Sequence, residues 1–206
     1  MRAVLISIKP QWCELIASGE KTVEVRKTRP KIETPFKVYI YCTQGKLADL
    51  GVIGQTIYEK RMKVIGEFVC DEITEYEGEF YDDETYENIK KIIHTADWEG
   101  YPEIDYNFIA ENGEENSLCK SSCLTWAELR NYMGEGINTF YAWHISDLVV
   151  YGEPRELNSF CRNGECSRCG WLEDGRCLKR DEQNCYNKHR VKRSPQSWCY
   201  VEEVKR

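Results

Sequence analysis

The spacing of hydrophobic residues predicts a strand and then a short helix at the start of the chain. Residues 3–8, Ala-Val-Leu-Ile-Ser-Ile, form a short apolar run that ends at a lysine and a proline. This run predicts a first strand, because it is too short for a signal-peptide core or a membrane span. Pro10 suits the first helical position and Gly19 suits the position just past a helix end. Between them, the apolar side chains follow i, i+3, i+4 helical spacing: Trp12, Leu15 and Ile16.

Further along the chain, runs rich in β-branched and aromatic residues predict more strands. The predicted strands cover residues 21–28, 37–43, 63–73 and 138–145, and another begins at 148. Thr125 and Glu128 have the spacing of a capping box, which predicts a helix that runs to about Met133. Short strands, frequent turn residues and few helices favour an α+β fold, a small β-barrel with accessory helices.

Composition divides the predicted fold into a main domain and a tail. Residues 75–115 are acidic and weakly periodic, and we expect an insertion at about 75–120 with one helix near residues 84–94. Pro154 marks the expected boundary between a domain of residues 1–153 and a cysteine-rich tail of residues 154–206 that packs on it. At 206 residues, the chain has the length of one domain with an appendage.

Charge is strongly segregated along the chain, although the net charge is −7. Residues 1–66 carry 12 Lys and Arg against 6 Asp and Glu, whereas residues 67–120 carry 3 against 17. A basic face that contacts phosphates is one explanation for the basic ends, and ordinary solvated surface charge is the other.

One charged segment has a pattern that suggests a binding cleft. It begins at the predicted helix end and reads Gly19-Glu20-Lys21-Thr22-Val23-Glu24-Val25-Arg26. Because side chains alternate along a strand, the two valines share one face while Glu24 and Arg26 share the other. A carboxylate between two cations can hold a phosphate and a base edge together. The alternative is an ordinary Glu24–Arg26 ion pair on the surface, which stabilises little.

This segment resembles the G-x-K-x-x-E-x-R pattern of the ASCH (ASC-1 homology) family. The sequence around it, Ser7-Ile8-Lys9-Pro10 before it and Tyr141-Ala142-Trp143-His144-Ile145 later, together with the terminal residues 195–203, resembles a bacterial and phage branch of that family. The resemblance implies a PUA-like barrel that recognises RNA or works on a modified nucleoside. It also implies a set of binding residues: Lys9, Lys21, Glu24 and Arg26.

A small branch of the same family hydrolyses acetylated cytidine with a lysine and a threonine of this motif and a glutamate elsewhere. Lys21 occupies the matching lysine position, but Glu24 stands where that branch has the threonine. A carboxylate does not replace a hydroxyl nucleophile, although it can act as a general base. If the chain is an enzyme, the resemblance implies Lys21 and Glu24 as its catalytic residues, and the departure at Glu24 favours a binding module.

The tail has the cysteine content of a zinc site. Cys166 and Cys169 form a C-x-x-C pair, and a structural zinc ion needs four such ligands. Cys199 is the third predicted ligand, and either Cys177 or Cys185 completes the set, with Cys161 and His189 in reserve. Free thiols, a redox pair and an iron–sulfur cluster are the alternatives. Eleven cysteines without a secretory signal favour the cytoplasm, where thiols stay reduced.

Three functions are therefore consistent with the sequence. The first is an RNA-binding module that uses the cleft near Lys21, Glu24 and Arg26. The second is a hydrolase that acts on a modified nucleoside or on RNA in the same cleft. The third is a protein-interaction module whose working surfaces are the acidic insertion and the tail. The sequence indicates no membrane association, and it leaves the oligomeric state open.

Overall fold

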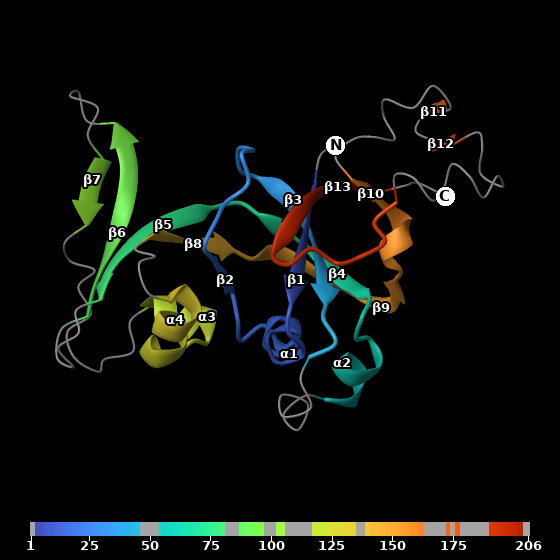
Figure 1. The fold of residues 1–206 in the computed structure, drawn as a ribbon, viewed down its shortest axis with the longest axis horizontal. Helices are drawn as coiled ribbons and strands as arrows, with labels where there is room; N and C mark the ends of the chain where they lie inside the picture. The colour runs from blue at the N-terminus through green and yellow to red at the C-terminus, as the bar shows by residue number, and fades with distance from the viewer. Residues whose placement is uncertain are drawn as a thin grey trace. The chain divides into compact units, whose positions relative to one another are not determined.

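The chain folds into two compact units, each built from segments that are distant in sequence. The computed structural model describes residues 3–45, 54–80, 87–96, 102–105, 117–134, 139–162, 172–173, 176–177 and 190–203. The first unit comprises Met1–Ala17, Phe36–Val69 and Asp147–Arg206, and the second comprises Ser18–Pro35 and Cys70–Ser146. Each unit is organised around one mixed or antiparallel sheet (Figure 1).

The sheet of the first unit has six strands in the order β10-β13-β1-β3-β4-β9. The strands are β1 (Ala3–Ile8), β3 (Phe36–Cys42), β4 (Val64–Cys70), β9 (Ser146–Arg155), β10 (Phe160–Arg162) and β13 (Trp198–Glu203). The helices are α1 (Pro10–Ser18), α2 (Gln55–Glu59) and the 3₁₀ turn η3 (Leu157–Ser159). A separate two-stranded ladder joins β11 (Leu172–Glu173) to β12 (Arg176–Cys177).

Strand β1 lies in the interior of this sheet, between β3 and the late strand β13. β1 pairs in parallel with β3 and antiparallel with β13, and all six of its residues are buried. A strand enclosed on both faces needs a continuous apolar run, which residues 3–8 provide. Ser7 Oγ also donates a hydrogen bond of 2.7 Å to the Pro195 carbonyl. The residues beyond Pro154, which itself lies inside β9, therefore supply two strands of the sheet.

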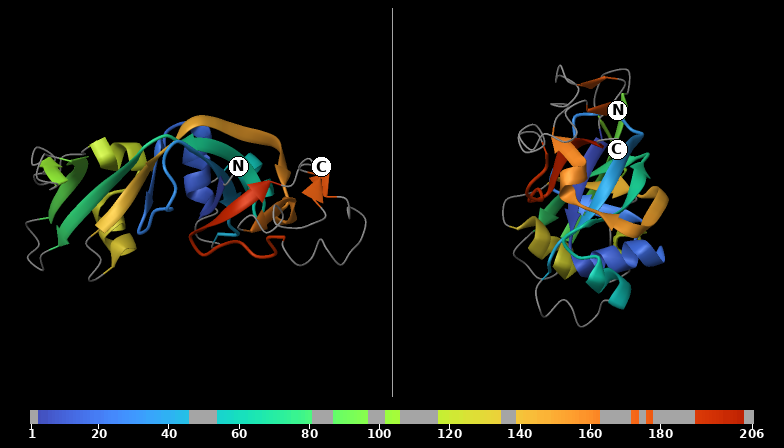
Figure 2. Two further views of the ribbon diagram at one scale, coloured as in Figure 1. Left: turned by 90° about the horizontal axis from the view of Figure 1, so that it is seen from above. Right: turned by 90° about the vertical axis from the view of Figure 1, so that its right-hand side faces the viewer.

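The sheet of the second unit has five strands in the order β2-β8-β5-β6-β7. The strands are β2 (Val23–Arg26), β5 (Ile73–Phe80), β6 (Glu87–Ala96), β7 (Pro102–Asp105) and β8 (Thr139–His144), and the helices are α3 (Ser117–Ser122) and α4 (Trp126–Met133). Strands β5 and β8 run side by side in Figures 1 and 2.

The core of the second unit lies between this sheet and its two helices. Tyr76 and Phe140 stack with ring centroids 5.2 Å apart, and α3 and α4 contribute Leu118, Leu129 and Met133. Phe140 and Met133 are fully buried at 0% exposure, so the helices are held by apolar packing against the strands. This packing brings the end of α3 next to the start of β2.

Two predicted helices are confirmed. α1 begins at Pro10 and ends at Ser18, where Gly19 has a left-handed φ of 82°. The capping box at the start of α4 is formed in both directions: Glu128 N donates to Thr125 Oγ1 over 3.2 Å, and Thr125 N donates to Glu128 Oε2 over 2.9 Å. None of the described helices is long and apolar enough to cross a membrane.

Two expectations about the fold are wrong. A helix is expected at residues 84–94, but the described part of this segment belongs to the strand β6, because it pairs antiparallel with β5 once that partner is present. The fold is α+β as predicted, but among the described strands neither sheet closes into a barrel. Each main sheet instead ends in two edge strands, β10 and β9 in one and β2 and β7 in the other.

Candidate functional site

The G-x-K-x-x-E-x-R segment connects α1 to the edge strand β2. Gly19 ends the helix with its positive φ, and the chain then enters β2, which pairs antiparallel with β8. Glu24 lies opposite Trp143 in this register, and Arg26 lies opposite Tyr141. The strand predicted over residues 21–28 is confirmed for Val23–Arg26, whereas Lys21 and Thr22 lie in the connection that precedes β2.

The three charged residues of the motif form a buried cluster. Lys21, Glu24 and Arg26 are exposed by only 2%, 6% and 7%. Arg26 Nη2 lies 2.9 Å from Glu24 Oε1, and Lys21 Nζ lies 3.4 Å from Glu24 Oε2. We refer to these three residues as the KER cluster. Its burial is inconsistent with the alternative interpretation of the sequence, an ordinary Glu24–Arg26 ion pair on the surface.

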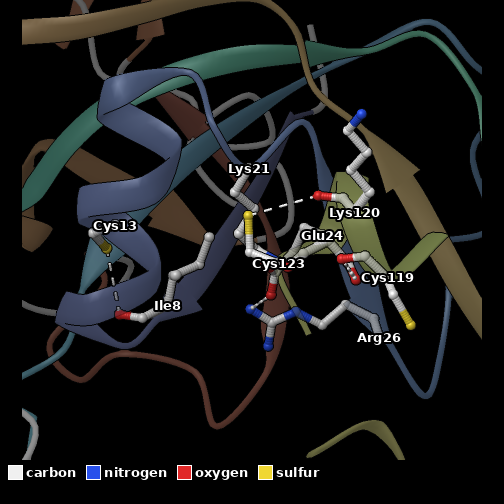
Figure 3. Close-up of polar contacts among 9 residues, drawn as sticks. Ile8, Cys13, Lys21, Glu24, Arg26, Cys119, Lys120 and Cys123 are labelled. Carbon is white, nitrogen blue, oxygen red and sulfur yellow. Dashed lines mark hydrogen bonds and ion pairs between the residues drawn. The ribbon is translucent and has the colours of Figure 1, made fainter. Parts of the chain in front are cut away.

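The KER cluster ties β2 to the end of α3. Lys21 Nζ donates a hydrogen bond of 2.6 Å to the Ser122 carbonyl, and Thr22 N donates one of 2.9 Å to the Ser121 carbonyl. Figure 3 shows Lys21, Glu24 and Arg26 beside the α3 residues Cys119 and Lys120. Carbonyls at a helix end have no partner within the helix, so a buried ammonium is a suitable donor for them.

The cluster contains two cations and one carboxylate, and its charge affects nearby groups. Burial raises the pKa of the Tyr132 phenol above its ordinary value; Arg26 opposes this rise and Glu24 adds to it. Burial likewise raises the pKa of the Cys123 thiol, and Lys21 opposes that rise. Lys27 adds a further positive charge at the end of α4: its Nζ donates to the Met133 carbonyl over 2.9 Å. The region is thus positive, enclosed and held by several elements.

The remaining predicted binding residue, Lys9, belongs to the first unit. It is exposed, and its carbonyl accepts the Cys13 N–H over 3.0 Å within α1. The structure thus brings together Lys21, Glu24 and Arg26 in the second unit, and Lys9 stays a prediction.

The predicted zinc ligands fall largely outside the described residues. Cys166, Cys169, Cys185 and His189 lie there, and for Cys177 the structure gives the backbone alone, paired with Leu172. Cys199 is half-buried in β13 and Cys161 is buried in β10. Among the residues that the structure describes, no group of His, Cys, Asp or Glu side chains could hold a metal ion. The zinc site stays a prediction.

A second feature is a pocket that adjoins β2 in the second unit, and no sequence motif indicates it. Its polar lining includes Glu72, Ser117, Ser121 and His144, which come from three separate elements or their ends. His144 Nδ1 lies 2.7 Å from Asp71 Oδ1, and this hydrogen bond lowers the pKa of the Asp71 carboxyl below its ordinary value. These residues have no motif spacing, so only the fold could bring them together.

Comparison with known proteins identifies the family. The α+β fold and the buried motif are accompanied by a match of residues 6–110 to the ASCH domain family model. The chain therefore belongs to the ASCH family, which is consistent with the PUA-like superfamily. No curated protein matches the chain.

Solved structures of an ASCH protein from Zymomonas mobilis are similar to this chain. One has 16% sequence identity and a TM-score of 0.49, with 97% of this chain and 87% of that chain covered. Two mutant proteins of it have 17% and 18% identity and TM-scores of 0.48 and 0.49. Each of these two matches also covers 97% of this chain, and they cover 90% and 88% of the mutant chains.

Proposed function

We propose that this chain binds RNA, and that the KER cluster provides the positive potential of the binding region in the second unit. The observation that carries the proposal is the burial of two cations around one carboxylate at the junction of β2 and α3. ASCH domains are associated with RNA-binding and hydrolase-like functions, which agrees with this reading.

The physical reason is that the electric field of a charge extends further from an enclosed site than from a site in water. Screening by solvent and salt weakens the field of exposed charges but much less that of buried ones. Glu24 compensates one of the two cations and holds the Arg26 guanidinium in one orientation at 2.9 Å. The remaining positive charge is then preorganised to attract a phosphate group, which reduces the side-chain entropy lost on binding.

A salt-titrated binding assay tests the proposal. Wild type, Lys21→Met and the control Lys37→Met are titrated with single-stranded and structured RNA. The control removes the same charge from a lysine that pairs with Glu67 over 2.7 Å in the first unit. We expect Lys21→Met to lower the affinity about tenfold and to reduce the salt slope by about 1, and Lys37→Met to bind like wild type.

The outcomes separate a binding role from a structural one. Circular dichroism and thermal melts establish that each variant is folded before its affinity is compared. If wild type shows no salt-dependent binding to either RNA, the chain is not an RNA-binding module of this kind. If both lysine variants lose affinity equally, the potential does not come from the KER cluster.

A hydrolase that acts on a modified nucleoside is the alternative proposal, and Lys21 is the residue that motivates it. Its position matches the catalytic lysine of one ASCH branch, but its Nζ uses its donors on the Ser122 carbonyl and on Glu24. A nucleophilic amine needs a lone pair directed at the substrate instead. Turnover of acetylated cytidine by wild type, lost in a folded Lys21→Met variant, would favour the hydrolase over the binding module.

We also infer from the sequence that the tail binds a structural zinc ion through Cys166, Cys169, Cys199 and either Cys177 or Cys185. Metal analysis of protein purified without chelators is expected to give about one zinc per chain. Cys166→Ser is expected to lose the metal, whereas Cys123→Ser, a control outside the tail, is expected to keep it. Equal zinc content in both variants contradicts the inference.

A further inference from the structure

The strand β9 of the first unit has an edge that is suited to pairing with another strand. Its ten residues end the six-stranded sheet, and among the described strands only β4 lies next to it. Val149 and Val150 are 50% and 39% exposed. Because consecutive side chains of a strand point to opposite faces, apolar surface is exposed on both faces of this edge. A long edge of this kind is a template on which a further strand can pair.

The backbone of β9 directs alternate residues toward its own molecule. The Val149 carbonyl comes so close to Gly66 of β4 that a Cβ on this glycine would lie 2.5 Å from the carbonyl oxygen. The Tyr151 carbonyl accepts a hydrogen bond of 2.6 Å from Lys60 Nζ. Since carbonyls alternate in direction along a strand, the residues between and beside these two direct their backbone groups to the outer edge: Leu148, Val150 and Gly152.

The charges of β9 are arranged symmetrically about Tyr151. Asp147 lies four residues before Tyr151, and Arg155 lies four residues after it. When two copies of β9 pair antiparallel with Tyr151 at the centre, each Asp147 lies opposite the Arg155 of the other copy. With Val150 at the centre, Asp147 would lie opposite Glu153 instead. Opposite charges at opposed positions stabilise a pair of strands and like charges destabilise it, so charge selects the first register.

The apolar residues of β9 are complementary in the same register. Leu148 lies opposite Pro154 of the second copy, and Val150 lies opposite Gly152. Gly152 is exposed, and no described atom lies within 4 Å of a Cβ placed on it, so there is space for the facing valine. This face of the paired strands is therefore apolar. The other face carries Tyr151 and Arg155, whose guanidinium lies 4.4 Å from the Tyr151 ring centroid.

Two irregular residues lie at the ends of this pairing and limit its length. Asp147 has a left-handed φ of 46°, so the chain bends there and the carboxylate lies at the end of the regular strand. Pro154 has no N–H and leaves one facing carbonyl without a donor. Proline and bends are typical of edges on which unlimited strand addition is avoided. They are compatible with a short pairing between two copies.

We propose that this chain forms a two-fold symmetric homodimer in which the β9 strands of two copies pair antiparallel about Tyr151. The pairing joins the two six-stranded sheets and gives the outward backbone groups of β9 a partner. A contact that uses the same patch on both copies closes at two. Because a strand edge buries little area, we expect a reversible dimer with a dissociation constant of roughly 10 μM.

Sedimentation velocity of the full chain over a concentration series tests the dimer. Wild type is compared with Asp147→Lys, with Arg155→Glu and with the control Arg193→Glu, an exposed arginine of the first unit outside β9. Each β9 variant replaces two ion pairs of the dimer with two pairs of like charge. We expect these two variants to self-associate at least about tenfold more weakly than wild type, and Arg193→Glu to behave like wild type.

An equimolar mixture of the two β9 variants tests the register. In a mixed dimer the introduced lysine lies opposite the introduced glutamate, and the remaining Asp147 lies opposite the remaining Arg155. Both pairs are then attractive. We therefore expect the mixture to associate about as strongly as wild type, although each component alone does not.

Each outcome either supports or overturns the dimer. Circular dichroism establishes that every variant is folded, and Val150→Lys, at an exposed position, replaces a charge variant that does not fold. A lysine there blocks strand pairing, so this variant is expected to stay monomeric. The proposal is overturned by a wild type that stays monomeric, by a β9 variant that associates like wild type, or by a mixture as weak as its components. No residue of the KER cluster changes, so these outcomes leave the proposed function untouched.

Discussion

Two lysine–glutamate pairs in this protein share their chemistry and differ in their surroundings. In the first unit Lys37 Nζ lies 2.7 Å from Glu67 Oε1, and the side chains are 40% and 19% exposed. In the second unit Lys21 Nζ lies 3.4 Å from Glu24 Oε2, and the side chains are 2% and 8% exposed. The closer pair is the more exposed one, so burial and not distance separates their roles.

The partners of the two carboxylates differ as well. Partial burial acts to raise the pKa of Glu67, but hydrogen bonds from Lys37 and Tyr151 outweigh it and lower that pKa below its ordinary value. Glu24 instead lies between two cations that have almost no access to water. Solvent can replace a lost partner at Glu67, but it cannot do so at Glu24.

The largest expected difference is in stability after loss of each carboxylate. Glu24→Ala leaves two buried cations without their shared partner, and we expect the free energy of unfolding to fall by about 3–5 kcal/mol. Urea denaturation followed by circular dichroism measures this change. A loss below about 1 kcal/mol would show that water reaches the KER cluster and that the contrast with Glu67 does not hold.

The matching change at Glu67 is expected to have a smaller effect. Glu67→Ala removes the partner of Lys37 and of the Tyr151 hydroxyl, both of which keep some access to water. We expect the free energy of unfolding to fall by about 1 kcal/mol, measured in the same urea series. If Glu67→Ala lowers the free energy of unfolding as much as Glu24→Ala does, water does not reach the Lys37–Glu67 pair and the contrast fails.

The smallest expected effect is on the pH dependence of stability, through the Glu67 carboxyl. Because its folded-state pKa lies below the ordinary value of 4.5, its stabilising contribution is present above about pH 4.5. The contribution is lost as the pH falls through the lower folded-state pKa. Thermal melts from pH 7 down to pH 3 are expected to show a shallower loss for Glu67→Gln than for wild type. If the melting temperatures of the two proteins fall in parallel as the pH is lowered, the lowered pKa of Glu67 is contradicted.

Several local features followed directly from neighbouring residues. The helix between Pro10 and Gly19 and the capping box of Thr125 and Glu128 formed as predicted. Both depend on contacts within a few residues, so tertiary packing had little to change. The helix expected at residues 84–94 was wrong for the opposite reason. β6 is set by pairing with β5, and a weakly periodic segment follows the partner that is available.

The candidate site also has a part that the sequence predicts, the motif residues, and a part that it does not, the pocket. The sequence placed Lys21, Glu24 and Arg26 on one strand segment and related them to the ASCH family, since the motif is eight consecutive residues. It did not reveal the pocket, because Glu72, Ser117 and His144 are far apart in the chain and share no spacing.

The amino-acid sequence alone determined the start of the first strand, the first helix, the capped helix and the family motif. Each of these depends on side chains close together in the chain, where propensity and short hydrogen bonds decide the outcome. Tertiary structure decided that the KER cluster is buried, that β13 pairs with β1 and that a pocket forms beside β2. Burial depends on which distant segments pack together, and strand alternation cannot reveal what will cover a given face.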